Sequence, residues 1–466
     1  MAGGTISFFT EMLAGIAERG RALMAGSRAA PSSASGLAAL AEELIGGSGE
    51  ASGVARAGDL IAAYAAAPLE TRRAFLGLLA MRFGPDEAAV GAAIEAYRAA
   101  PSPSAAMALH VAAEPRRQEL FRKLNRAPGG TLALVRMRED VIDARADPSL
   151  DAAGLADVDA DFRHLFASWF NRGFLALRRI EWTSPANVLE KIVAYEAVHH
   201  LESLEALKHR LAPPDRRLYA FFHPALVDEP LIFVEVALTR EIPGAIAPVL
   251  ARARTPIAPS EASVAVFYSI SNCQRGLAGV SFGSFLIKQV VEELRRDLPQ
   301  LKTFVTLSPV PGFARFLDRA LADPDETRID GQARAILARV PRSRLAEDEA
   351  AREALREPLR ALCAHYLVHE KDHGGKPLDP VARFHLGNGA RLERVHADAD
   401  LSERGIAQAA GLMVNYLYDL DAIERNHESY AERGEIAVSS DVRRLAKPAR
   451  AGRGPKEGAP VEAAAG

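Results

Sequence analysis

Residues 264–313 read VAVFYSISNCQRGLAGVSFGSFLIKQVVEELRRDLPQLKTFVTLSPVPGF and predict a strand, a glycine-containing loop, a helix and a second strand. Residues 264–270 are rich in β-branched and aromatic side chains, as strands are. After Ser284 the apolar side chains recur at helical spacing, at Leu286, Ile287, Val290, Val291, Leu294 and Leu298. Pro299 ends this helix, and residues 303–307 form the second strand. A Ser-Pro-Val-Pro-Gly turn starts at Ser308, so the unit ends on a hydroxyl group.

The loop between the first strand and the helix contains Gly276, Gly279 and Gly283. A glycine loop that leads into a helix offers free backbone N–H groups and the positive end of the helix dipole to a phosphate. The spacing is not Gly-x-Gly-x-x-Gly, and the Gly-Lys-Ser/Thr ending of a P-loop is missing. A phosphate site and an ordinary strand–loop–helix connection therefore both remain open.

Length and composition limit the class of protein. The chain has 466 residues, which predicts two to three domains, and 48% of them are hydrophobic, enough for large cores. A formal net charge of −3 is not typical of a nucleic-acid binder. No apolar run approaches the roughly 18 to 20 residues that span a bilayer, and the N-terminus does not read as a secretory signal. We therefore expect no nucleic acid and no membrane as partners.

The two cysteines, Cys273 and Cys363, imply no disulfide framework and fit a reducing compartment, so a cytoplasmic location is expected. Cys273 lies in the glycine loop, where it is either a reactive thiol or a buried, unreactive one.

The composition changes along the chain and predicts its domains. Residues 1–179 read as an all-α domain with no β-rich run before residue 217, and this domain is expected to build a homodimer or homotetramer. Residues 180–440 are expected to form a catalytic domain, with a helix at 187–210, strands at 217–222 and 231–238, and a helical insertion at 314–360. Residues 441–466 are rich in Pro, Gly, Ala and charge and read as a disordered tail.

Seven short motifs together resemble the malonyl-CoA decarboxylase family, and their joint occurrence in this order is highly specific. The resemblance covers about residues 180–420. The motifs begin at His223 (HPALVDEPL), Tyr268 (YSIS), Gln274 (QRGLAGV), Gly283 (GSFLIK), Leu307 (LSPVPGF), Arg383 (RFHLGNGA) and Gly411 (GLMVNYLY).

The resemblance implies an α+β fold in which a helical N-terminal domain precedes a mixed-sheet catalytic domain of the GNAT acetyltransferase type. In that fold the strand–loop–helix unit holds the CoA pyrophosphate, and adjacent parallel strands part to admit the pantetheine arm. The loop would correspond here to Ala278, Gly279, Val280, Ser281, Phe282, Gly283 and Ser284. The chain departs from the usual Arg/Gln-x-x-Gly-x-Gly/Ala pattern, because Ser281 occupies the first glycine position.

The family also implies a reaction, the decarboxylation of malonyl-CoA to acetyl-CoA and CO2 in fatty acid metabolism. The catalytic pair would correspond to Ser308 and His385, and Tyr418 matches a tyrosine close to the site. Loss of CO2 leaves an enolate that the thioester itself delocalises, so neither a metal nor an organic cofactor is expected. A histidine can carry and give a proton near neutral pH, which suits the protonation of carbon.

Each of these residues also has a structural interpretation. A serine before proline at the end of a strand is commonly a turn former. A histidine between Phe384 and Leu386 is commonly a packed, hydrogen-bonded side chain, and tyrosines such as Tyr418 commonly line cores.

A second group of polar residues has the spacing of a metal site. His365, His369 and His373 recur at intervals of four, but the His-Glu-x-x-His pattern is absent, and we expect no metal. Two rival functions remain for the chain as a whole: an acyl-CoA-dependent N-acyltransferase on the same frame, and a non-catalytic acyl-CoA sensor.

Overall fold

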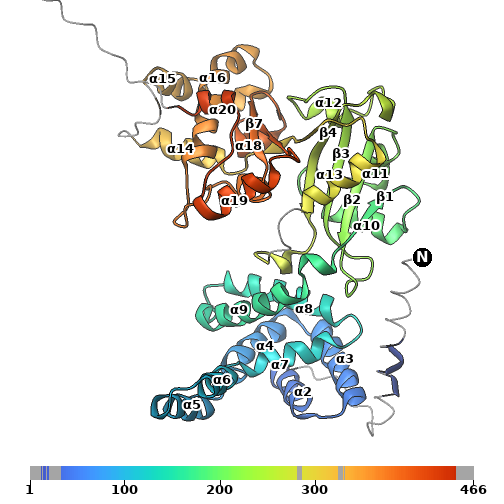
Figure 1. Cartoon of the computed structure of the whole chain (residues 1–466), viewed down its shortest axis with the longest axis vertical. Helices are drawn as coiled ribbons and strands as arrows, with labels where there is room; N and C mark the ends of the chain where they lie inside the picture. Colours follow the sequence, from blue (N-terminus) through green and yellow to red (C-terminus); the bar gives the residue numbers. More distant parts are fainter. Residues whose placement is uncertain are drawn as a thin grey trace, which may run out of the picture.

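The computed structural model describes residues 33–280, 286–323, 329 and 331–447, with positions 12, 14–16, 18 and 19. Figure 1 shows the order of the parts: a group of helices comes first, a sheet with its covering helices follows, and a second group of helices surrounds the last strands. This order confirms the expected fold class, helices followed by a mixed α+β part. In the described residues no helix is both long and apolar enough to cross a membrane.

The first group, called the helical region below, consists of α2 (Ala34–Gly46), α3 (Glu50–Ala66), α4 (Leu69–Arg82), α5 (Glu87–Ala99), α6 (Pro103–Ala112), α7 (Arg116–Asn125), α8 (Gly130–Arg145) and α9 (Ala152–Trp169). Four helices begin at side-chain caps, where Ser33, Asp86, Ser102 and Asp151 accept from backbone N–H groups. The hairpin of α5 and α6 buries none of its side chains.

The sheet has eight strands in the described chain: β1 (Ala176–Ile180), β2 (Arg216–Phe222), β3 (Pro230–Thr239), β4 (Val264–Asn272), β5 (Thr303–Thr306), β6 (Ser308–Pro309), β7 (Arg391–His396) and β8 (Met413–Leu417). The order across it is β1-β2-β3-β4-β5-β8-β6, and β7 pairs with β8. The β4–β5 pair is parallel, and the other described pairs are antiparallel. The sheet is therefore mixed.

Two expectations about the start of the sheet are wrong. A strand occurs before residue 217, because β1 begins at Ala176, inside the part expected to be helical. Its sequence, ALRRI, has little strand propensity, and pairing with β2 holds it extended. The single helix expected at 187–210 is two helices, α10 (Ala186–Tyr195) and α11 (Leu204–Leu211).

The remaining helices are α12 (Ala247–Leu250), α13 (Leu286–Asp297), α14 (Phe313–Ala322), α15 (Gly331–Arg339), α16 (Glu349–His369), α17 (Pro380–Gly387), α18 (Glu403–Ala409), α19 (Ile423–Arg433) and α20 (Ser440–Leu445). The last of these corrects the predicted tail, which was expected to begin at residue 441. Val442 is fully buried, and α20 packs against α16 and β7. Ser439 caps α20 and donates to the Glu393 carbonyl, so the chain is anchored here.

The parallel strands β4 and β5 part halfway along β4. Their pairing runs from Val264 opposite Thr303 to Phe267 opposite Thr306, and the Leu307 N–H still donates to the Phe267 carbonyl. β4 then continues to Asn272 along β3 alone, while β5 has ended. The sheet therefore opens at the point where the chain reaches Ser308.

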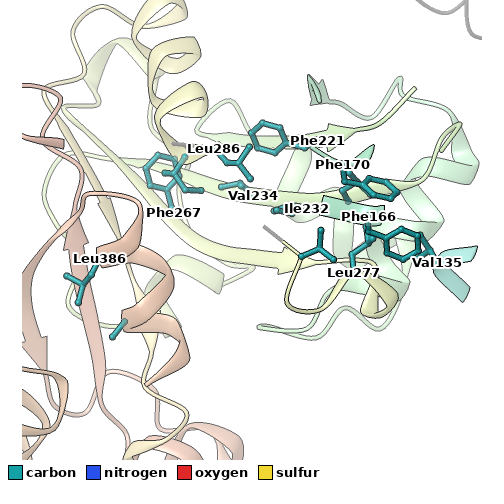
Figure 2. Packing of buried hydrophobic residues seen from close by; sticks show 14 of the residues in the cluster. Val135, Phe166, Phe170, Phe221, Ile232, Val234, Phe267, Leu277, Leu286 and Leu386 are labelled. Carbon is teal, nitrogen blue, oxygen red and sulfur yellow. The ribbon is translucent and has the colours of Figure 1, made fainter. Parts of the chain in front are cut away.

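One buried apolar cluster connects the sheet with the helical region. In Figure 2 the cluster runs from Leu386 on one side, past Phe267 and Leu286, to Phe166 and Val135 on the other, with Leu277 beside the last two. The loop that follows β4 thus packs against the helical region.

Candidate active site

The structure brings together the three residues singled out for catalysis. The Ser308 Oγ lies 3.2 Å from the Nε2 of His385, and the His385 Nδ1 lies 2.8 Å from the Tyr418 hydroxyl. The three side chains come from β6, α17 and the residue that follows β8. They are called the Ser–His–Tyr cluster below.

Asp379 places the helix that carries His385. It caps α17 by accepting from the N–H groups of Val381 and Ala382 at 2.9 and 3.0 Å. Its other oxygen accepts from the Gly312 N–H at 3.3 Å, in the turn that follows Ser308. One buried carboxylate therefore ties the serine turn to the histidine helix.

The surroundings of His385 favour the neutral imidazole. Only 3% of the residue is exposed, and its ring stacks on Tyr416 with centroids 4.6 Å apart. Burial lowers the pKa of His385 to about 3, because the charged form would lose its hydration. Burial therefore favours the neutral imidazole over the imidazolium, and the expected role of His385 in giving a proton stays a prediction.

The hydrogen bonds also assign the tautomer of His385. Ser308 donates its only hydroxyl hydrogen to the Thr306 Oγ1 at 2.9 Å, so the hydrogen between Ser308 and His385 must sit on Nε2. Nδ1 is then an acceptor, and the Tyr418 hydroxyl donates to it. Burial raises the pKa of Tyr418 well above its ordinary value, which keeps that hydroxyl protonated.

Thr306 is a site residue that the sequence analysis missed. Its Oγ1 accepts from Ser308 and also from the Tyr416 N–H at 3.0 Å, so its position is fixed by the backbone of β8. Asn415 donates to the Thr306 carbonyl at 2.7 Å and adds a second link to β8. A signal for Thr306 is present in the sequence: residues i and i+2 of a strand share a face, and Thr306 precedes Ser308 by two.

The expected CoA loop is described only in part. Ser281, Phe282, Gly283 and Ser284 lie outside the described residues, whereas Ala278, Gly279 and Val280 follow β4 directly. Ala278 and Gly279 are exposed, and Gly279 has a φ of 73°, in the left-handed region that favours glycine. β4 and β5 are parallel, so the loop after β4 and Ser308 after β5 both follow the C-terminal ends of strands, and β4 runs on to Asn272 beyond its last pairing with β5 at Phe267.

The other candidate groups do not join the Ser–His–Tyr cluster. Cys273 is buried, and burial raises the pKa of its thiol well above the ordinary value, which favours the unreactive alternative. His365 and His369 have ring contact, and His365 approaches Glu370 at 3.6 Å. In the part of the chain that the structure describes, no three His, Cys, Asp or Glu side chains are arranged to hold a metal ion.

Known protein families and individual proteins resemble this chain over most of its length. Two family models match the chain, the malonyl-CoA decarboxylase C-terminal domain at residues 173–455 and the malonyl-CoA decarboxylase N-terminal domain at residues 83–170. The mitochondrial malonyl-CoA decarboxylase of the goose Anser anser anser is 38% identical over 348 residues, which cover 70% of this chain and 69% of the relative.

Solved structures extend the likeness to three dimensions. The malonyl-CoA decarboxylase of Rhodopseudomonas palustris is 56% identical, with a TM-score of 0.84 over 89% of this chain and 100% of that one. That of Agrobacterium vitis is 53% identical, with a TM-score of 0.83 over 88% of this chain and 99% of that one. With both domain models matched in order and the fold shared over most of its length, the chain belongs to the malonyl-CoA decarboxylase family.

Proposed function

We propose that the chain decarboxylates malonyl-CoA to acetyl-CoA and CO2, through a thioester enolate that is protonated on carbon. Family membership supports this reaction. The observation that carries it is the Ser–His–Tyr cluster, a buried chain of neutral hydrogen-bond donors where β4 and β5 part. In the reaction the bond between the carboxylate and the α-carbon breaks, CO2 leaves, and its electron pair passes into the thioester carbonyl.

The proposed pose follows from the sheet. Residues 278–284 would hold the CoA pyrophosphate, and the pantetheine arm would pass between β4 and β5 toward Ser308. The malonyl group would then meet the Nε2–H of His385 beside Ser308, which directly follows β5 and Leu307. Donors held in place in a dry site stabilise a developing oxyanion strongly, by roughly 3–4 kcal/mol each.

A neutral histidine suits this chemistry. A thioester enolate is a far stronger base than an imidazolate or a phenolate, so the α-carbon can be protonated by an acid that carries no charge. In the proposed mechanism the Nε2–H of His385 supplies that proton, directly or through Ser308, and the hydrogen of Tyr418 shifts toward Nδ1. The negative charge of the malonyl carboxylate then remains on the hydrogen-bonded His385 and Tyr418. A proton from water returns these two side chains to their neutral forms.

The site residues thus have different proposed roles. Ser308 and His385 touch the reacting group, and Tyr418 holds the tautomer that puts a hydrogen on Nε2. Thr306 orients the Ser308 hydroxyl. No metal or organic cofactor enters any step.

A transferase or a sensor on the same frame would behave differently. An N-acyltransferase needs an amine acceptor, and a sensor binds acyl-CoA without consuming it. Incubation with malonyl-CoA alone separates the three functions, because only the decarboxylase releases CO2 without an acceptor.

We also propose that the helical region joins copies of the chain into a homodimer or homotetramer. The α5–α6 hairpin supports this, because it buries none of its side chains while Met107 and Val111 are 61% and 63% exposed. A monomer by light scattering at micromolar concentration would refute it. A cytoplasmic location stays a prediction. The goose relative carries the word mitochondrial in its name, so members of the family need not share the location expected here.

A further inference from the structure

Helix α8 of the helical region forms hydrogen bonds with the loop that follows β4. On α8, the Arg138 Nη1 donates to the Gly276 carbonyl at 2.7 Å, and the Glu139 carboxylate accepts from the Gly276 N–H at 3.2 Å. Gly276 lies in the short helical turn η3 (Arg275–Leu277), two residues before Ala278. Both polar backbone groups of this loop residue are therefore taken by one helix that precedes it by more than a hundred residues.

The packing at Gly276 is too close for any other residue. A Cβ at this position would lie 2.0 Å from the carbonyl oxygen of Val135, so even alanine would push the loop away from α8. The neighbours on either side are held as well. Arg275 pairs with Asp143 through two bonds of 2.5 and 2.7 Å, and Leu277 is buried beside Val135 (Figure 2).

Arg138 is itself fixed. It is 2% exposed, and its Nε donates to one oxygen of Asp159 at 2.8 Å. The other oxygen of Asp159 accepts from Arg145 at 2.9 Å. The guanidinium of Arg138 thus connects a buried carboxylate in α9 with the loop, whereas Arg145 shares the carboxylate and makes no described contact with the loop.

We propose that Arg138 is a positioning residue for the CoA thioester, and that α8 holds residues 275–280 in the conformation that binds the nucleotide end. The inference rests on the proposed function, because that function places the CoA pyrophosphate at residues 278–284. Backbone N–H groups bind a phosphate well only when their directions are set beforehand. Without the contacts of α8 with Gly276, the loop would have to become ordered when CoA binds. Affinity then falls, while the reacting groups at Ser308 and His385 are unchanged.

The test compares three variants in the full chain. Arg138→Met removes the bond to the loop and one partner of Asp159. Gly276→Ala places a Cβ against Val135 of α8 and displaces the loop, but it changes neither Arg138 nor Asp159. Arg145→Met is the matched control, because it removes an arginine from the same carboxylate but no loop contact. For the first two we expect the KM for malonyl-CoA and the Kd for CoA to rise about tenfold, the usual scale for a lost charged hydrogen bond, with kcat within about twofold. Arg145→Met should keep the KM and Kd of the original chain.

Two readouts separate this inference from the proposed function. The Kd for CoA, measured by equilibrium titration, needs no turnover. A chain that binds CoA but releases no CO2 contradicts the proposed reaction and leaves the comparison of Kd values valid. If Gly276→Ala keeps the original KM and Kd, the inference is overturned, even where Arg138→Met fails to fold. A fall in kcat at unchanged KM would overturn it as well, since Arg138 would then act on the chemistry.

Discussion

The hydroxyl hydrogen of Ser308 decides which atom donates in each hydrogen bond between Thr306, Ser308, His385 and Tyr418. Because the hydroxyl donates to Thr306, Nε2 of His385 must donate to Ser308, and Tyr418 must donate to Nδ1. Residue-scale changes in this chain therefore act on the protonation of carbon and leave the CoA-binding end alone.

The catalytic pair gives the most direct substitutions. His385→Asn keeps a polar side chain of moderate size but has no group that relays a proton between Ser308 and Tyr418. We expect kcat to fall on the order of a hundredfold or more, the usual scale for acid–base catalysis. Ser308→Ala should also lower kcat, because the oxygen that accepts from the Nε2–H of His385 and holds that donor in place is lost. Equilibrium titration should give the original Kd for CoA in both variants, and near-normal turnover of the folded proteins would contradict the assignment.

Thr306 allows a sharper test of the tautomer. Thr306→Val has nearly the same shape but no acceptor for the Ser308 hydrogen, so Ser308 can turn and donate to Nε2 instead. We expect a lower kcat and a shift of the His385 tautomer toward Nδ1–H in nitrogen NMR spectra. Thr306→Ser keeps the oxygen and should restore both. A valine variant with the original tautomer and kcat would remove Thr306 from the account.

The pH dependence follows from the neutral imidazole. A pKa of about 3 for His385 means that the same neutral form is present across the whole neutral range. We therefore expect kcat to be flat between roughly pH 5.5 and 8, with no step near the ordinary histidine pKa. A kcat that falls with an apparent pKa near that ordinary value would show that an imidazolium is the acid. The depressed pKa also weakens folding in acid: its contribution to stability is present above the unfolded pKa and is lost as the pH falls toward about 3.

At the scale of elements, the placement of α17 depends on its cap. Asp379→Ala removes the cap and the link to Gly312, so we expect a stability loss of about 1 kcal/mol or more, together with a lower kcat. Ser402→Ala is the control, because Ser402 caps α18 by accepting from the Gly405 N–H at 3.0 Å, and α18 carries no residue of the Ser–His–Tyr cluster. It should lose similar stability in denaturant unfolding and keep its kcat. Equal kcat losses in the two variants would show that the cap of α17 has no specific role.

The sequence predicted the elements that carry strong local patterns. The apolar periodicity of α13 and the β-branched runs of β3 and β4 are local signals, and each element is confirmed within a few residues. β1 was missed because its five residues owe their conformation to pairing with β2. The break between α10 and α11 was missed because the sequence around it has no proline or glycine.

The site shows the same division between local and distant information. Ser308, His385 and Tyr418 were predicted through family motifs, and the structure brings them together. The sequence could not show that His385 is buried and stacks on Tyr416, a contact between distant segments, and this burial lowers the pKa of the imidazole. Arg138 was missed for a related reason. Its partner Gly276 lies 138 residues further along the chain, and no local pattern around Arg138 predicts that contact.

At the scale of the whole molecule, the helical region and the sheet share one apolar core, and α8 contacts the loop after β4. The helical region was expected to build a homodimer or homotetramer. Its contacts with Gly276 give it a proposed second role, which is to prepare the surface that meets the nucleotide end of the substrate.

The chain is proposed to decarboxylate malonyl-CoA with its own residues alone. The most direct test is incubation of purified protein, dialysed against a chelator, with malonyl-CoA and no amine acceptor, while CO2 and acetyl-CoA are measured together. We predict that each malonyl-CoA consumed yields one CO2 and one acetyl-CoA, and that in deuterated water the new methyl group carries solvent deuterium. Malonyl-CoA that stays intact while bound, or that disappears only after an amine or a metal ion is added, would contradict the claim.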